Sequence, residues 1–172
     1  MRMETLNGPS GTAMMAALAD VGVHFVAALP DIVTSDCLLW PLSRDKRFRL
    51  IRLCKEDEGV SICTGLAMTG HRSVLLMQQT GLLDSLNAIR AIAVEYAQPV
   101  CMLVGLQGKE AEQLPSTSKR FGVRIVEPIL DAMGIDHINI EGPGDEATIS
   151  PAIARAYALQ RPLVALIGRT VQ

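Results

Sequence analysis

Residues 73–87 read Ser-Val-Leu-Leu-Met-Gln-Gln-Thr-Gly-Leu-Leu-Asp-Ser-Leu-Asn. The uninterrupted apolar run at 74–77 predicts a short strand buried on both faces, because a strand with one wet face would alternate. Two amides, a hydroxyl and a glycine come next, and an apolar helical pattern starts at Leu82. A buried strand that turns directly into a helix is the repeating unit of parallel α/β sheets, so this stretch predicts that fold class.

The same alternation of short apolar runs and helical patterns continues in both directions along the chain. Strands are predicted at residues 23–29, 49–53, 73–78, 100–105, 138–141 and 163–167. Helices are predicted at residues 9–21, 35–42, 56–69, 82–96, 123–133 and 145–159. We therefore expect residues 1–172 to form a single three-layer α/β/α domain with a mostly parallel six-stranded sheet.

The composition is apolar for a soluble monomer. With 49% hydrophobic and 20% charged residues the chain is not of the disordered class. A net charge of -2 also disfavours a nucleic-acid binder, which normally carries a basic face. The mean hydropathy of +0.27 therefore indicates either a membrane span or a surface that partner chains cover.

Run lengths decide between these two possibilities. Apolar runs such as 23–29, 100–105 and 163–168 are far shorter than the roughly 20 residues of a spanning helix. Residues 1–8 lack the uninterrupted apolar core of a secretory signal. We therefore expect an oligomeric cytoplasmic protein.

The cysteines and histidines show no metal-ligand spacing. There is no Cys-x-x-Cys pair, and His24, His71 and His137 are far apart in the sequence. We expect structural roles for His24 and His71, which lie in or beside strands, and no metal site on this chain. Buried, reduced, structural thiols are expected at four positions, by the usual habit of cytosolic cysteines: Cys37, Cys54, Cys63 and Cys101.

Ligands of parallel α/β sheets bind beyond the carboxyl ends of the strands. Four loops lie there in the predicted topology, at residues 30–35, 54–58, 78–81 and 105–121. In one of them the acidic triplet Glu56-Asp57-Glu58 opens a helix of small residues, where acidic side chains also simply complement the helix dipole. In another, Gln78, Gln79 and Thr80 suit hydrogen bonding to a flat heterocycle, and equally suit a plain turn.

In collinear order, these segments resemble the pyrimidine-binding domain of thiamine diphosphate-dependent decarboxylases. The resemblance is greatest to sulfopyruvate decarboxylase alpha subunits, with phosphonopyruvate decarboxylases as near relatives, and it covers nearly the whole chain. Four motifs carry the resemblance. Two of them begin at the ends of the first and third predicted strands, Leu29-Pro30-Asp31 and Met77-Gln78-Gln79-Thr80-Gly81-Leu82-Leu83-Asp84. The other two lie at the ends of later predicted helices, Tyr96-Ala97-Gln98-Pro99 and Leu130-Asp131-Ala132-Met133-Gly134-Ile135.

The resemblance implies roles for particular residues. One glutamate in this family hydrogen-bonds N1′ of the cofactor's aminopyrimidine and favours its imino tautomer. The family register, counted back from Gly65, assigns this catalytic role to Glu56 and leaves Glu58 as a solvent or interface carboxylate. The resemblance further implies that the cofactor's pyrimidine pocket is lined by Pro30, Gln78, Gln79 and Thr80.

Substrate contacts are implied on two further loops. Asp31 is expected either to reach the substrate or to cap the helix that comes after it. Relatives often carry Arg-Gly after the fourth strand, where Gln107-Gly108 stands here. The positive charge for a sulfonate or phosphonate must then come from Lys119 and Arg120, from Lys109, or from a partner, unless these cations only keep the loop solvated.

Half of the expected site is missing from the sequence. Thiamine enzymes hold Mg²⁺ and the diphosphate with Gly-Asp-Gly and a later asparagine, whereas this chain has Gly144-Asp145-Glu146 and no asparagine beyond it. We therefore expect a beta subunit that carries the diphosphate- and Mg²⁺-binding domain, in a hetero-oligomer.

The resemblance as a whole implies the alpha subunit of a heteromeric decarboxylase. The expected reaction converts 3-sulfopyruvate into sulfoacetaldehyde and CO2. The alternatives are phosphonopyruvate or another 2-oxo acid as substrate, or a non-catalytic α/β binding or regulatory domain. A dinucleotide-binding domain is disfavoured, because there is no Gly-x-Gly-x-x-Gly after the first strand.

Overall fold

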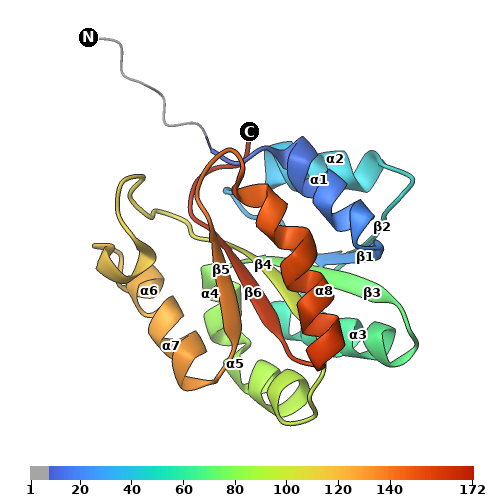
Figure 1. Ribbon diagram of the computed structural model, residues 1–172. Helices are drawn as coiled ribbons and strands as arrows, with labels where there is room; N and C mark the ends of the chain where they lie inside the picture. Colours follow the sequence, from blue (N-terminus) through green and yellow to red (C-terminus); the bar gives the residue numbers. More distant parts are fainter. Residues whose placement is uncertain (1–7) are drawn as a thin grey trace.

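The computed structural model describes residues 8–172, so the expectation for the first seven residues lies outside the described part. Six strands form one sheet in the order β2-β1-β3-β4-β6-β5, and every neighbouring pair is parallel. The strands are β1 Val23–Ala28, β2 Arg49–Arg52, β3 Arg72–Gln78, β4 Cys101–Gly105, β5 Asp136–Ile140 and β6 Leu163–Ile167. The expected three-layer α/β/α class is confirmed (Figure 1).

The central strands of the sheet are more deeply buried than the edge strands. Every residue of β4 and β6 is buried, and β3 is buried except at its two ends. These central strands are apolar throughout because helices cover both of their faces. The edge strands β2 and β5 contain exposed positions and more polar side chains.

Helices cover the sheet on both sides (Figure 1). One core lies under α1 Gly11–Asp20, α2 Trp40–Arg44 and α8 Ile149–Leu159, with the π-helical turn η1 Ser35–Leu39. The opposite core lies under α3 Glu56–Met68, α7 Val126–Ala132 and the π-helical segment η2 Ile89–Val94. The smaller elements are α4 Gln79–Asp84, α5 Leu86–Ala88, α6 Phe121–Arg124 and the 3₁₀ turns η3 Pro115–Thr117 and η4 Asp145–Thr148.

The helix predicted at 82–96 is different in the structure. It begins three residues earlier, because β3 passes into α4 at Gln79 without an intervening loop. It is also divided into α4, α5 and η2, with a break at Ser85. The residues between strand and helix that were expected to form a turn, including Gly81, therefore form the first turn of a helix.

Three other predicted helices are segmented as well, the one at 35–42 into η1 and α2, and one strand is longer. The predicted helix at 123–133 begins at Phe121 and divides into α6 and α7, and the one at 145–159 starts with the 3₁₀ turn η4. Strand β5 starts at Asp136, earlier than predicted, because this edge strand pairs with β6 from Asp136↔Leu163 onward.

The cysteine expectation is correct for two of the four thiols. Cys63 and Cys101 are buried, and burial raises the pKa of Cys63 to about 11. Cys54 is exposed and Cys37 is half-buried, so the expectation is wrong for these two. Cys54 lies beyond the end of β2, where the chain leaves the sheet for the surface. In residues 8–172, no helix has both the length and the apolar character needed to cross a membrane.

Candidate functional site

The parallel sheet brings the predicted loops to one edge. Gln78, Gly105 and Ile167 end neighbouring strands in register, so the segments that leave these three strands start side by side. The loops after β1 and β2 join the same edge, because both strands run in the same direction. The carboxyl edge of the sheet is therefore the place where the polar residues of this apolar chain gather.

Glu56 is the first residue of α3 and lies against Gly81 of α4. A Cβ atom at position 81 would clash with Cγ, Cδ and Oε1 of Glu56, so only glycine leaves room for the carboxylate there. The side chain is half-buried, and within residues 8–172 no hydrogen bond is made to its carboxylate. Glu56 thus presents an uncommitted acceptor at the edge of the sheet.

Glu58 has a different environment, although it lies only two residues further on. Its Oε2 accepts hydrogen bonds from the backbone N–H groups of Cys54, at 3.0 Å, and Lys55, at 3.3 Å. It therefore satisfies donors at the start of α3, as an acidic residue in the first helical turn commonly does. Glu58 thus caps α3, and among the described residues 8–172 Glu56 is the glutamate of the triplet whose carboxylate has no partner.

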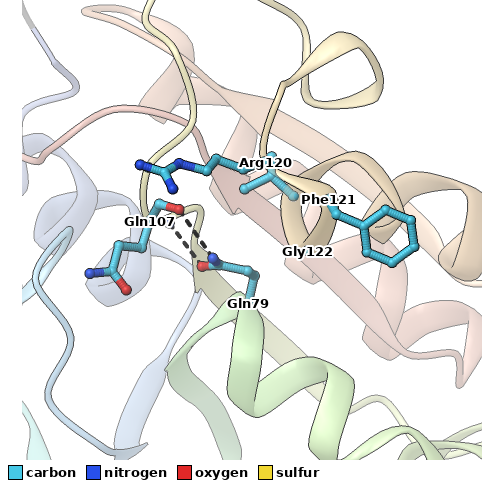
Figure 2. A pocket seen from close by; sticks show the side chains of 7 residues that line it. Gln79, Gln107, Arg120, Phe121 and Gly122 are labelled. Atoms are coloured by element: carbon cyan, nitrogen blue, oxygen red, sulfur yellow. Dashed lines mark hydrogen bonds between the residues drawn. The ribbon is translucent and has the colours of Figure 1, made fainter.

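Gln79 joins β3 to the loop after β4. Its side-chain Oε1 accepts from the backbone N–H of Gln107 at 2.8 Å, and its Nε2 donates to the backbone carbonyl of Gln107 at 3.1 Å (Figure 2). The neighbouring Gln78 donates from Nε2 to Oε1 of Gln107 at 2.5 Å. Both glutamines lie where the sequence predicts a binding pocket, but Gln79 is buried and holds the edge together.

Thr80 and Pro30 are exposed, on different parts of the edge. Thr80 lies in the first turn of α4, next to Gly81. Pro30 lines a cavity of about 240 Å³ between the ends of β1 and β2, together with Trp40 and Arg52. The structure therefore places the predicted cofactor residues along one edge, without closing them into a single pocket.

Asp31 is buried in the turn after β1. Its Oδ1 accepts from the backbone N–H groups of Val33, at 2.6 Å, and Thr34, at 3.0 Å, and its Oδ2 accepts from the hydroxyl of Thr34. These bonds stabilise the turn at residues 31–34, whereas the N-cap of η1 is Thr34, and a contact of Asp31 with substrate stays a prediction. The carboxylate also packs against Gly105, where a Cβ atom would approach Oδ1 to 2.7 Å.

The two cations predicted to bind substrate are in different positions. Arg120 lines a cavity of about 400 Å³ together with Gln79, Gln107 and Gly108, and its side chain extends toward the Gln107 turn (Figure 2). Lys119 is exposed and does not line this cavity.

A carboxylate anchors the loop that carries both cations. Glu110 accepts from the Ser118 hydroxyl at 2.8 Å and from the backbone N–H of Lys119 at 3.2 Å. The hydrogen bond from Ser118 is the main reason why the pKa of Glu110 lies below its ordinary value. Glu110, near the start of the loop, is therefore bonded to Ser118 and Lys119 near its end, so the loop is not a free surface segment.

The charged cluster formed by Lys109, Glu141 and Arg169 was not predicted from the sequence. The Lys109 side chain is 0% exposed, and its Nζ lies 2.9 Å from Oε2 of Glu141. The Nε atom of Arg169 lies 3.9 Å from the same oxygen. Lys109 is thus committed to an ion pair, whereas the sequence left it among the possible substrate cations. The rule that points to strand ends also applies to Glu141 after β5 and Arg169 after β6, and it would have found them.

The chain is similar to several known proteins, although no protein-family model matches the sequence. One relative is "Sulfopyruvate decarboxylase subunit alpha" of Methanococcus maripaludis, at 33% identity over 102 residues, which span 59% of this chain and 60% of that subunit. Another is the protein of the same name from Methanocaldococcus jannaschii, at 28% identity over 156 residues, or 90% of each chain.

A third relative is longer. "Sulfopyruvate decarboxylase" of Methanosarcina acetivorans is 27% identical over 155 residues, which are 90% of this chain but 38% of that protein. Among solved structures, the 2-oxoglutarate:ferredoxin oxidoreductase of Magnetococcus marinus shares the fold, with a TM-score of 0.67 at 14% identity over 91% of this chain and 28% of that chain. The relatives confirm the resemblance to sulfopyruvate decarboxylase alpha subunits.

Proposed function

We propose that this chain, whose relatives are named as alpha subunits of sulfopyruvate decarboxylase, is the pyrimidine-binding subunit of a thiamine diphosphate-dependent 2-oxo acid decarboxylase. The observation that carries the proposal is the position of Glu56. Of the two glutamates in the acidic triplet, it is the one that is not used in capping, and a glycine makes room for it. The proposal treats residues 1–172 as one pyrimidine-binding domain.

The residues at the edge fit an aminopyrimidine. Glu56 offers a carboxylate acceptor without an internal partner, as a ring nitrogen that carries a proton requires. Gln78, Thr80 and the exposed Pro30 lie on the same edge and would line the ring, while Gln79 holds the edge in shape. Thiamine diphosphate supplies the electron sink for decarboxylation when it is bound. Glu56 would hold a proton at N1′ of its pyrimidine.

The proposed substrate is 3-sulfopyruvate, which would yield sulfoacetaldehyde and CO2. The names of the relatives and the Arg120 cation at the carboxyl edge support this choice over a 2-oxo acid without a second anionic group. Arg120 would contact an acidic group of the substrate from its cavity, and Lys119 would add positive charge on the same loop. Both carboxylate oxygens of Asp31 accept hydrogen bonds within the turn after β1. Asp31 would therefore contact the substrate only from the side of its carboxylate that faces away from the turn.

We further propose that a beta subunit completes the site by holding Mg²⁺ and the diphosphate. The Gly-Asp-Gly motif expected for that task is replaced by Gly144-Asp145-Glu146 in this chain. Asp145 accepts from the backbone N–H groups of Glu141 and Gly142, and the buried Glu146 accepts from those of Ser10 and Gly144. Both acids thus accept hydrogen bonds from backbone N–H groups of this chain, which supports a partner as the source of the metal site.

The matched variants Glu56→Gln and Glu58→Gln test the proposal in the complex with the partner subunit. Glu56→Gln should lower kcat by about 10²–10⁴-fold, because a neutral amide cannot hold the proton in the same way. Glu58→Gln should stay within a few fold, since its amide oxygen can still accept from the helix start. Circular dichroism and gel filtration would confirm that both variants fold and assemble. Equal activity of the two variants would contradict the assignment of Glu56, whereas a wild-type complex without decarboxylase activity would favour a non-catalytic binding domain.

A further inference from the structure

A second cavity lies on the other side of the Gln107–Gly108 turn from the Arg120 cavity. It measures about 480 Å³, and both cavities include Gln107 and Gly108 in their walls. The second cavity is bounded by the loop after β1, the start of the loop after β4 and the segment after β6. It therefore lies at the same carboxyl edge as Glu56, between strands that are central in the sheet.

The charged side chains of this cavity are cationic. Within residues 8–172, the side chains with a formal charge in its wall are those of Lys109 and Arg169. Behind the wall, Glu141 pairs with Lys109 and lies near Arg169, so one carboxylate faces two cations. The cluster keeps a net charge of about +1, and a low-dielectric concave wall strengthens the attraction of such a charge for an anion.

Within this cluster Arg169 is the cation that a ligand can reach. The Lys109 side chain is 0% exposed, whereas that of Arg169 is 20% exposed. The Nε and Nη2 atoms of Arg169 donate to the backbone carbonyl of Ala111, at 3.2 and 2.7 Å. These bonds fix the guanidinium in place and leave its Nη1 group without a hydrogen-bond acceptor within residues 8–172. A guanidinium held in this way matches the oxygens of a sulfonate or carboxylate.

We propose that Arg169, supported by Lys109 and Glu141, binds the sulfonate of the substrate in this second cavity. This inference rests on the proposed function and adds to it. A 3-sulfopyruvate molecule carries two acidic groups, and the Arg120 cavity accounts for one of them. The sulfonate takes no part in bond breaking, so a cation that binds it in the second cavity would contribute binding energy remote from the reacting carboxylate.

The experiment compares Arg169→Gln with Arg161→Gln in the complex with the partner subunit. Arg161 is an exposed arginine that precedes β6, at the opposite edge of the sheet, and serves as the matched control. Loss of a charge-assisted contact predicts a rise of about tenfold to hundredfold in KM for 3-sulfopyruvate in Arg169→Gln. Its kcat/KM for pyruvate, which lacks the sulfonate, should change less than about twofold, and Arg161→Gln should match the wild type on both substrates.

A structural role of Arg169 gives a different pattern. If the arginine only anchors Ala111, Arg169→Gln and Arg169→Lys should lose activity equally on 3-sulfopyruvate and on pyruvate, and this result would overturn the proposal. If Arg169 binds the sulfonate, Arg169→Lys should retain part of the preference for 3-sulfopyruvate, because it keeps the positive charge. An unchanged KM for 3-sulfopyruvate in Arg169→Gln would also overturn the proposal.

A second measurement separates this inference from the proposed function. Sulfoacetate, a sulfonate without a 2-oxo group, should raise the melting temperature of the full chain, and Arg169→Gln should abolish that rise. If the wild-type complex fails to decarboxylate any 2-oxo acid, the proposed function fails, while the sulfoacetate result still decides the anion site. If the complex is active but sulfoacetate stabilises the wild type and Arg169→Gln equally, only the anion site fails.

Discussion

At the residue scale, Glu56 and Glu58 are only two positions apart but have different surroundings. Glu58 faces the start of its own helix, where backbone N–H groups have no helical partner and take up its carboxylate. Glu56 faces the neighbouring helix α4 at Gly81, and within residues 8–172 its carboxylate accepts no hydrogen bond. Glycine at position 81 therefore provides space for the Glu56 carboxylate, and it is not there to allow an unusual backbone dihedral angle.

This contact predicts the effect of Gly81→Ala. Alanine favours a helix by up to about 1 kcal/mol over glycine, so the fold should be retained. The added methyl group must displace the Glu56 carboxylate, because that flexible side chain gives way more easily than the backbone. We expect decarboxylation by the complex to fall by about tenfold or more, while the melting temperature stays the same or rises.

The control for this variant is Gly65→Ala in α3, where a Cβ atom would meet nothing within 4 Å. It should give the same helix stabilisation and leave the turnover number unchanged. Full activity of Gly81→Ala would mean that Glu56 does not depend on its contact with that glycine.

At the scale of elements, the site depends on how two helices start. Gly59 lets α3 approach the sheet closely, since a Cβ atom there would clash with Leu75 of β3 and approach Leu53 to 2.8 Å. Strand β3 passes into α4 without a loop, so Gln79 is fixed at the junction and reaches the backbone of Gln107. The close packing at Gly59 and the side-chain amide of Gln79 therefore link the positions of α3, α4 and the loop after β4.

The link predicts that Gln79→Ala destabilises the protein by about 1–2 kcal/mol, because two hydrogen bonds to partly buried backbone groups are lost. Urea unfolding measures this change, and hydrogen exchange should show faster exchange in residues 106–120. Gln78→Ala removes the more exposed of the two glutamines and should change the free energy of unfolding by less than about 0.5 kcal/mol. Equal destabilisation by both changes would show that the Gln79 pairing is not what holds the edge.

At the scale of the whole molecule, the carboxyl edge carries apolar side chains that nothing in the described chain covers. Ile32, Leu114 and Phe121 are 71%, 64% and 66% exposed; Ile32 lies in the loop after β1, Leu114 in the loop after β4, and Phe121 at the start of α6. Exposed apolar residues around polar cavities are typical of a surface that binds another protein. The relative from Methanosarcina acetivorans, of which this chain matches 38%, fits the proposal that further residues from a second polypeptide complete the site here.

This picture predicts that the chain alone binds thiamine diphosphate weakly and does not decarboxylate 3-sulfopyruvate. Addition of a partner that carries Gly-Asp-Gly and a later asparagine should restore both properties, with one cofactor at each interface between unlike subunits. Isothermal titration with and without the partner measures cofactor binding, and sedimentation measures assembly. Robust turnover by the purified chain on its own would contradict the proposal that the site is shared.

The sequence alone determined the sheet and the acidic start of α3. Strands β3, β4 and β6 are continuously apolar because both faces are covered, and this pattern is local, so it can be read without knowing the neighbours. The family register selected Glu56 over Glu58, and this choice stays a prediction; the structure shows that Glu58 accepts from the backbone at the start of α3. Helix breaks were not predictable in the same way, because apolar periodicity continues across Ser85.

Tertiary structure decided which residues meet. Glu56 and Gly81 come from different helices, and Lys109, Glu141 and Arg169 lie after three different strands. Their proximity depends on strand order and register, which place β4, β6 and β5 side by side. The sequence does not distinguish a buried lysine from one on the surface. Burial of the lysine becomes tolerable only through its ion-pair partner, which comes from another segment of the chain. Local patterns report what a residue prefers, whereas contacts between distant segments arise only when the whole sheet brings them together.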